Sequence, residues 1–71
     1  MTIIDQIELC EIQQDLAEQR MEVCYDEAAS AEDPLWVDFN IVEGDIHKRH
    51  VKLWAATIGA LSLMVEDVDN E

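Results

Sequence analysis

Apolar and small residues recur at alternating spacings of four and three along the first part of the chain. They occupy Ile3, Ile7, Cys10, Ala17, Met21, Cys24 and Ala28, with polar Gln14 in the gap. This heptad spacing predicts a helix over about residues 3–29 with one buried stripe. Thr2 is a suitable N-cap, and Asp5 lies in the first turn, where a carboxylate suits the helix dipole.

A second apolar stripe follows the same rhythm about a third of a turn away, at the advance of ~100° per residue of an α-helix. Its members are Leu9, Ile12, Leu16 and Val23. A single neighbouring helix covers only one of the two stripes. The other stripe therefore requires a further helix or another subunit.

The segment "SAEDP" predicts a turn, because Asp33 can cap a second helix and Pro34 suits its first position. The pattern favours a helix over about residues 34–66. Residues 35–43 also fit a short strand, since residues 37–41 alternate between apolar and polar and are rich in strand-forming types. Gly44 is suited to end such a strand or to kink a helix.

Residues 34–66 are apolar over a wide arc, which is typical of a helix with neighbours on several sides. We therefore expect one domain, residues 1–71, of the all-α class: an antiparallel helical hairpin that dimerises into a four-helix arrangement. The alternative is a monomeric three-helix bundle, with a break at Gly44 between residues 34–43 and 45–66. The residues expected in the core or dimer contact are Ile7, Leu16, Met21, Val51, Trp54, Ile58 and Leu61.

Composition narrows the class of partner. The formal net charge of −13 repels nucleic-acid phosphates and anionic membranes and favours a cationic protein surface, while 49% hydrophobic residues argue for a folded chain. The longest apolar stretch, residues 53–65, is shorter than the ~17 to 25 residues that span a bilayer. Two cysteines without a CxxC motif or a secretory signal indicate a reduced, cytoplasmic protein.

The first predicted helix carries an acidic ridge, six carboxylates on one face at spacings of three and four. They are Glu8, Glu11, Asp15, Glu18, Glu22 and Asp26. The simplest interpretation is a solvated face, and the functional one is a docking surface for a basic partner. Trp36, Phe39 and Ile41 are the expected apolar contacts beside it.

Three of the four basic residues and both histidines lie in "HKRHVK", residues 47–52. If the chain turns around Ala31, positions whose numbers add to about 63 face one another. That register predicts an internal counter-charge with these facing positions: Lys48 with Asp15, Lys52 with Glu11, and Arg49 with Gln14.

Glu43, His47 and His50 follow the spacing i, i+4, i+7 on one helix face. Imidazole nitrogen and carboxylate oxygen are zinc ligands, so this trio is a candidate metal site. The alternative interpretation places both histidines in the core or at a dimer contact. We expect the second, and no cofactor.

No catalytic constellation or phosphate-binding loop stands out, so we expect a protein that is not an enzyme. The composition is similar in character to small phage or mobile-element proteins that inhibit host factors. The expected function is to occlude a basic or helical surface of a transcription regulator, nuclease or nucleic-acid-binding complex, in the host cytoplasm if phage-encoded. The alternatives are a metal-binding helical protein and a structural subunit of a larger assembly.

Overall fold

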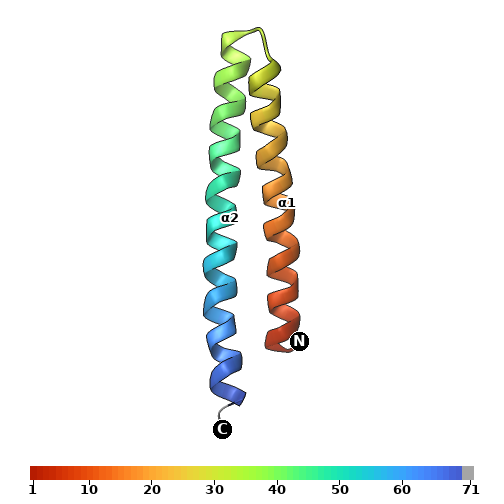
Figure 1. Cartoon of the computed structure of the whole chain (residues 1–71), viewed down its shortest axis with the longest axis vertical. Helices are drawn as coiled ribbons and strands as arrows, with labels where there is room; N and C mark the ends of the chain where they lie inside the picture. The colour runs from red at the N-terminus through yellow and green to blue at the C-terminus, as the bar shows by residue number, and fades with distance from the viewer. Residues whose placement is uncertain (70–71) are drawn as a thin grey trace.

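The protein folds as two antiparallel helices joined by a short turn (Figure 1). The computed structural model describes residues 1–69, with side chains for residues 1–65. Helix α1 spans Ile3–Ser30 and helix α2 spans Pro34–Asp69. The hairpin measures 58 × 14 × 14 Å. The all-α helical hairpin predicted from the sequence is confirmed.

Both helix starts follow the predicted capping chemistry. The Thr2 Oγ1 accepts from the Asp5 backbone N–H at 3.1 Å, and the Asp5 carboxylate accepts from the Thr2 N–H at 3.2 Å, which completes a capping box. At the start of α2 the Asp33 carboxylate accepts from the Leu35 N–H at 3.0 Å, ahead of Pro34 at the first helical position. These side chains satisfy N–H groups that have no partner within the helix.

Residues 35–43 are helical, so the strand considered for this segment and the break considered at Gly44 are both wrong. Helix α2 runs through them without interruption, and no strand occurs in residues 1–69. The physical reason is that a short strand leaves its backbone groups unpaired unless another strand lies beside it. A helix satisfies the same groups within the segment, and the Asp33 cap favours its start.

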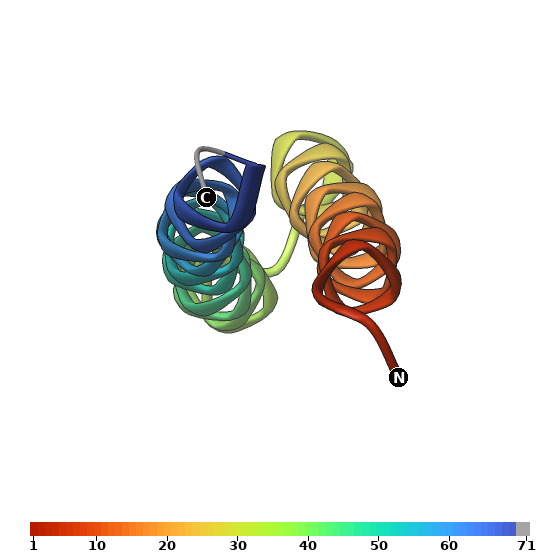
Figure 2. The same cartoon turned by 90° about the horizontal axis from the view of Figure 1, so that it is seen from below.

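The two helices meet along one seam of heptad positions a and d, all of them buried or half-buried. On α1 Ile7 is at position a and Cys10 at d, and on α2 Val37 is at a and Asn40 at d. On α1 the seam contains Ile3, Ile7, Cys10, Gln14, Ala17, Met21, Cys24 and Ala28. On α2 it contains Val37, Asn40, Gly44, His47, Val51, Trp54, Ile58, Leu61 and Val65. The end view in Figure 2 shows two helices lying side by side with no third layer between or around them. The first apolar stripe of the sequence is therefore the intramolecular contact.

Gly44 leaves room in the seam for the aromatic ring of Tyr25. A Cβ added at Gly44 would lie 2.7 Å from Cε1 and 2.9 Å from Cδ1 of Tyr25, so the tyrosine ring occupies the space that a side chain would need. At Gly59 the same Cβ would meet nothing within 4 Å. Gly44 is thus required for packing, and the kink proposed for it is absent.

The hairpin leaves a large surface uncovered for its mass. Its accessible area is 5367 Å², whereas a compact monomer of 8.1 kDa exposes about 4,500 Å². Its radius of gyration is 16.4 Å, against about 11 Å for a compact chain of this length. Among residues 1–65 only Cys10 and Ala17 are buried apolar side chains, at 8% and 5% exposure, and both cysteines are free thiols. No helix in the described part of the chain has the length and apolarity needed to cross a membrane.

Candidate functional site

The seam divides the remaining surface of the hairpin into two sides. On one, the Tyr25 hydroxyl donates a hydrogen bond of 2.6 Å to Asp45 Oδ1, which links heptad position e of α1 to position b of α2. On the other, Arg20 and His50, both at position g, line a groove between the helices. We call the first the ridge side, made of positions b and e, and the second the groove side, made of positions c and g.

The acidic ridge lies on α1 and faces solvent along its whole length. Its members Glu8, Glu11, Asp15, Glu18, Glu22 and Asp26 are all exposed. All but Asp26 occupy positions b and e and therefore belong to the ridge side. No lysine or arginine nitrogen lies within 4.0 Å of a carboxylate among the side chains of residues 1–65, so these carboxylates are free to meet another molecule.

The register predicted for the basic cluster is wrong. Tyr25 packs against Gly44 and bonds to Asp45, so facing positions add to about 70 rather than 63. The cause is the turn: Ala31 leaves α1 in an extended conformation, φ −74° and ψ 140°, so α2 starts beyond the end of α1. The pairings that this register does not form are Lys48 with Asp15, Lys52 with Glu11, and Arg49 with Gln14.

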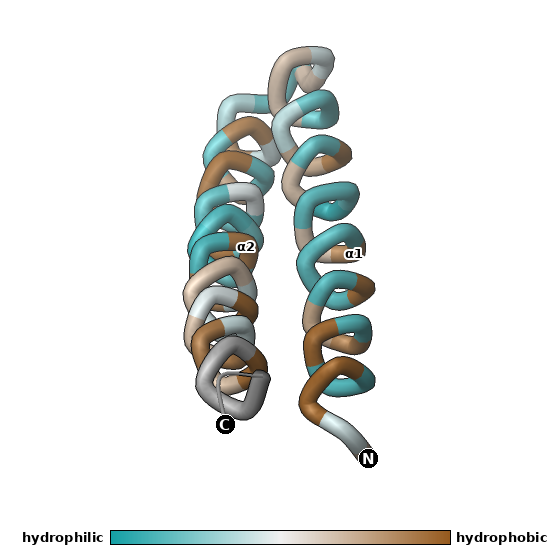
Figure 3. The backbone as a smooth tube through the Cα atoms, turned by 60° about the horizontal axis from the view of Figure 1, so that its bottom comes forward, coloured by the Kyte–Doolittle hydropathy of each residue, from teal (hydrophilic) through white to brown (hydrophobic). Residues whose placement is uncertain are grey.

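The basic cluster nevertheless borders the acidic ridge. Lys52 lies one heptad after Asp45, and Glu18 lies one heptad before Tyr25, so Lys52 and Glu18 occupy the positions equivalent to the hydrogen-bonded pair. They form no ion pair within 4.0 Å. Figure 3 shows the hydrophilic middle of α2, with more apolar segments towards both ends. The ridge side is therefore charged in both helices at mid-length.

The three expected apolar contacts do not share one surface. Trp36 and Phe39 stack at 5.2 Å between ring centroids with 13° between planes, and both are about half exposed, at 49% and 51%. They occupy positions g and c, on the groove side near the turn. Ile41 occupies position e on the ridge side. The aromatic pair thus lies round the helix from the acidic ridge rather than beside it.

The trio proposed for a metal does not assemble. His47 Nε2 lies 3.7 Å from Glu43 Oε2, whereas the His47 and His50 rings meet edge to face at 6.0 Å between centroids. Among the described residues no three histidine, cysteine or carboxylate side chains lie close enough to hold a metal ion. His47 lies in the seam at position d, and His50 lies beside it on the groove side.

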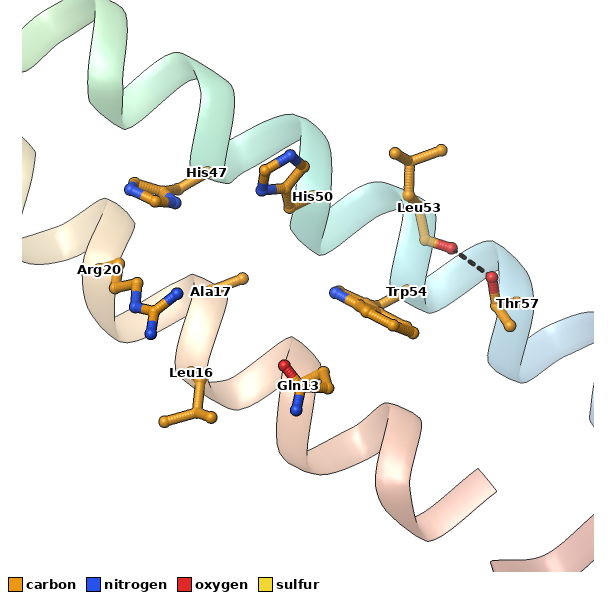
Figure 4. Close-up of a pocket in the computed structure, with 9 residues that line it drawn as sticks. All are labelled: Gln13, Leu16, Ala17, Arg20, His47, His50, Leu53, Trp54 and Thr57. Carbon is orange, nitrogen blue, oxygen red and sulfur yellow. Dashed lines mark hydrogen bonds between the residues drawn. The ribbon is translucent and has the colours of Figure 1, made fainter. Parts of the chain in front are cut away.

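The groove has a volume of about 430 Å³ and lies between the helices at mid-length (Figure 4). His47 and Trp54 reach from α2 into the space between the two ribbons, while Leu16 points away from α2. Leu53 likewise points away from α1, so the two leucines form the outer rims. The groove is therefore lined by both polar and apolar side chains, with the two leucines at its outer edges.

The apolar rims continue along both helices at position c. On α1 they are Leu9, Leu16 and Val23, exposed by 47%, 40% and 59%. On α2 they are Phe39, Ile46 and Leu53, exposed by 51%, 39% and 64%. Among residues 1–65 the only carboxylates at positions c and g are Glu27 and Glu43. Among the positions that flank the seam, apolar residues therefore gather on the groove side and acidic residues on the ridge side, while exposed Ile12, Val42 and Leu63 lie at position f, opposite the seam.

The residues predicted for the core or the dimer contact lie in two places, the seam and the groove side. Ile7, Met21, Val51, Trp54, Ile58 and Leu61 lie in the seam. Leu16 lies outside it, on the groove side. The second stripe of the sequence therefore remains uncovered.

The ionisation of Tyr25 makes the stability of the hairpin depend on pH in the alkaline range. Its hydrogen bond to Asp45, then its burial and the charge of Asp45, raise the pKa of Tyr25 above the ordinary value of 10.0. The folded state therefore holds this proton more tightly than the unfolded state. Its contribution to stability is complete below about pH 10 and is lost as pH rises through the raised pKa.

We expect the stability difference between the native protein and Tyr25→Phe to shrink above about pH 10. Phenylalanine keeps the ring over Gly44 and removes only the hydroxyl, so it is the matched control. Thermal unfolding at several pH values measures the difference. Because the chain has one tyrosine, tyrosinate absorbance reports this group alone. An identical decline with pH in both proteins would contradict the assignment.

Sequence reasoning missed two features of the site. The contact of Tyr25 with Gly44 was missed, although the spacing Val37, Asn40, Gly44 and His47 continues the 3,4 rhythm and signals a seam glycine. The groove with Arg20 was missed because its two walls come from different helices, so it depends on the register.

No protein-family model, curated protein or solved structure matches the chain. The functional argument therefore rests on three features of the hairpin. These are the unpaired acidic ridge, the exposed aromatic pair near the turn and the uncovered groove side.

Proposed function

We propose that the protein is an acidic binding module which, as a homodimer, regulates or inhibits a host factor by covering a basic or helical surface on it. A transcription regulator, a nuclease or a nucleic-acid-binding complex has such a surface. The observation that carries the proposal is the acidic ridge, whose six exposed carboxylates have no lysine or arginine partner within 4.0 Å. On this proposal the protein is a phage or mobile-element type of inhibitor that acts in the cytoplasm by binding alone.

The energetics of the ridge support a docking role. Like charges at i, i+3 and i+4 each cost a helix about 0.2–0.5 kcal/mol. A basic partner relieves this repulsion and is drawn to the ridge from a distance, so the encounter is fast and charge-specific. The gain falls with salt, because exposed charges are screened over about 10 Å at 0.1 M. Ile41, half-exposed on the same side, adds an apolar contact near the turn.

The ridge is tested with the double variant Glu11→Lys and Glu18→Lys. Its affinity for a lysine-rich helical peptide, used as the basic probe, should fall by at least about tenfold at low salt, and the loss should diminish as salt is added. The control compares the single variants Glu18→Lys and Glu32→Lys, which change the net charge equally, because Glu32 lies in the turn, off the ridge and off the groove side. We expect Glu32→Lys to lose less than about threefold.

Isothermal titration at two salt concentrations measures the affinities, with far-UV circular dichroism to verify helicity. Equal losses in the two single variants would mean that net charge, and not the ridge, attracts the probe. No loss in any variant would remove the docking role.

A further inference from the structure

We infer that the occupant of the groove side is a second copy of this chain. The two hairpins pack with positions c and g facing each other, which forms a four-helix bundle with one acidic ridge on each outer side. This inference rests on the homodimer in the proposed function and deepens it by assigning the interface and the placement of the ridges. The argument has three parts: area, apolar pattern and charge.

The uncovered area matches what a stable dimer needs. The hairpin exposes 5367 Å², about 900 Å² more than a compact monomer of its mass. A specific protein interface of standard size buries about 800 Å² on each partner. One face-to-face contact along the hairpin therefore brings the exposed area per chain to that of an ordinary globular protein.

The apolar pattern selects the groove side. Large apolar side chains repeat at position c on both helices, with exposed Leu16 and Leu53 on opposite rims of the groove. On the ridge side the large exposed apolar residues are Ile4 and Ile41, separated along the hairpin by the charged middle. Continuous apolar stripes on two parallel rims fit the helices of a second hairpin, and isolated residues do not.

Charge excludes the ridge side as the contact between copies. Pairing there would bring two acidic ridges together, with like charges that repel strongly when water is removed. The groove side instead carries Arg20 together with Glu27 and Glu43, and Arg20 has no carboxylate within 4.0 Å among residues 1–65. The groove side thus carries charges of both signs and few of either, so two groove sides can face each other without the repulsion of two acidic ridges, as a two-fold interface requires.

A consequence for binding follows from this arrangement. Each dimer presents two acidic ridges that point away from one another, so it binds two basic surfaces at once. The aromatic pair Trp36 and Phe39 lies on the groove side and is covered, at least in part, by the second copy. The surfaces left for another protein are then the ridge with Ile4 and Ile41, and the apolar side chains at position f, among them Ile12 and Val42.

The first test uses the unmodified chain. An isotope-filtered NOE experiment on a mixture of labelled and unlabelled protein detects contacts between copies. We expect intermolecular NOEs at the methyl groups of Leu16, Ile46 and Leu53, and none at Ile4 or Ile41. Intermolecular NOEs confined to Ile4 and Ile41 would overturn the assigned face, and a monomer without any would overturn the second copy as occupant.

The second test is a matched pair of substitutions, Leu16→Glu and Ile41→Glu. The two side chains are equally exposed in the hairpin, at 40% and 41%, but lie on opposite sides. Leu16→Glu should raise the dimer dissociation constant by at least about tenfold, whereas Ile41→Glu should leave it within about twofold. Sedimentation equilibrium measures both constants. An equal effect of the two substitutions would contradict the assignment.

The dimer interface and the docking role of the ridge can be tested separately. Glu11→Lys with Glu18→Lys should keep the dimer mass while losing the basic probe, because the ridge lies away from the contact. A dimer that binds no basic peptide would remove the proposed function and leave the assigned interface intact. A monomer that still binds the peptide would remove the assigned interface and leave the docking role of the ridge intact.

Discussion

Replacing Gly44 by alanine should lower the free energy of unfolding by about 1 kcal/mol, because overpacking costs about 1–3 kcal/mol and outweighs a helix-propensity gain of about 1 kcal/mol. The added methyl group would lie 2.7 Å from the Tyr25 ring. That ring has little freedom to move aside, since its hydroxyl is bound to Asp45. Urea unfolding at a fixed protein concentration measures the change.

Gly59→Ala is the matched control, because a methyl group there meets nothing within 4 Å. It should raise the free energy of unfolding by about 0.5–1 kcal/mol through helix propensity alone. In a Tyr25→Ala background the space over Gly44 is free, so Gly44→Ala should then be stabilising. If Gly44→Ala stabilises the protein with Tyr25 present, the helices do not approach as closely as described.

Ile58→Ala should lower the free energy of unfolding by about 2 kcal/mol, near the lower end for isoleucine because the side chain is half-buried rather than enclosed. Ile58 lies at position a in the seam, where its methyl groups pack against α1. The matched substitution is Ile4→Ala, whose side chain is 57% exposed. Its effect should stay within about 0.5 kcal/mol.

Urea unfolding compares the two isoleucine variants at equal protein concentration. The pair separates burial in the seam from the loss of an isoleucine as such. Equal costs at Ile58 and Ile4 would contradict the seam and would require another packing of the helices.

The helices and their ends were predictable because the signals are local. Thr2 with Asp5, and Asp33 with Pro34, are capping patterns that act within one turn. The first apolar stripe was predictable as a buried face because its heptad spacing is a property of the helix alone. Which of the two stripes the second helix covers depends on the packing and was not predicted.

The register was not predictable from the same signals. It depends on how the chain leaves α1 at Ala31, whose backbone is extended, before α2 begins, and the facing sum is larger than predicted by about seven. The charge pairs of Lys48, Arg49 and Lys52 were therefore assigned to the wrong positions. Surface ion pairs contribute only about 0–1 kcal/mol each, too little to set the register against seam packing.

The residues predicted to form one site lie on different sides of the hairpin, because neighbours in sequence point in different directions from a helix. Trp36, Phe39 and Ile41 lie close together in sequence, but about 100° per residue places Ile41 on the ridge side and the aromatic rings on the groove side. The metal trio failed because sharing a helix face does not bring His47 and His50 rings to a common point. Sequence spacing predicts which face of a helix a residue occupies. The residues that it contacts depend on how the other helix packs.

The central claim is that one hairpin leaves its groove side open and that a second copy covers it. Sedimentation equilibrium of the unmodified chain, diluted through the micromolar range, tests this most directly. We predict a particle of twice 8.1 kDa that dissociates only on further dilution. A stable particle of 8.1 kDa at micromolar concentration would contradict it.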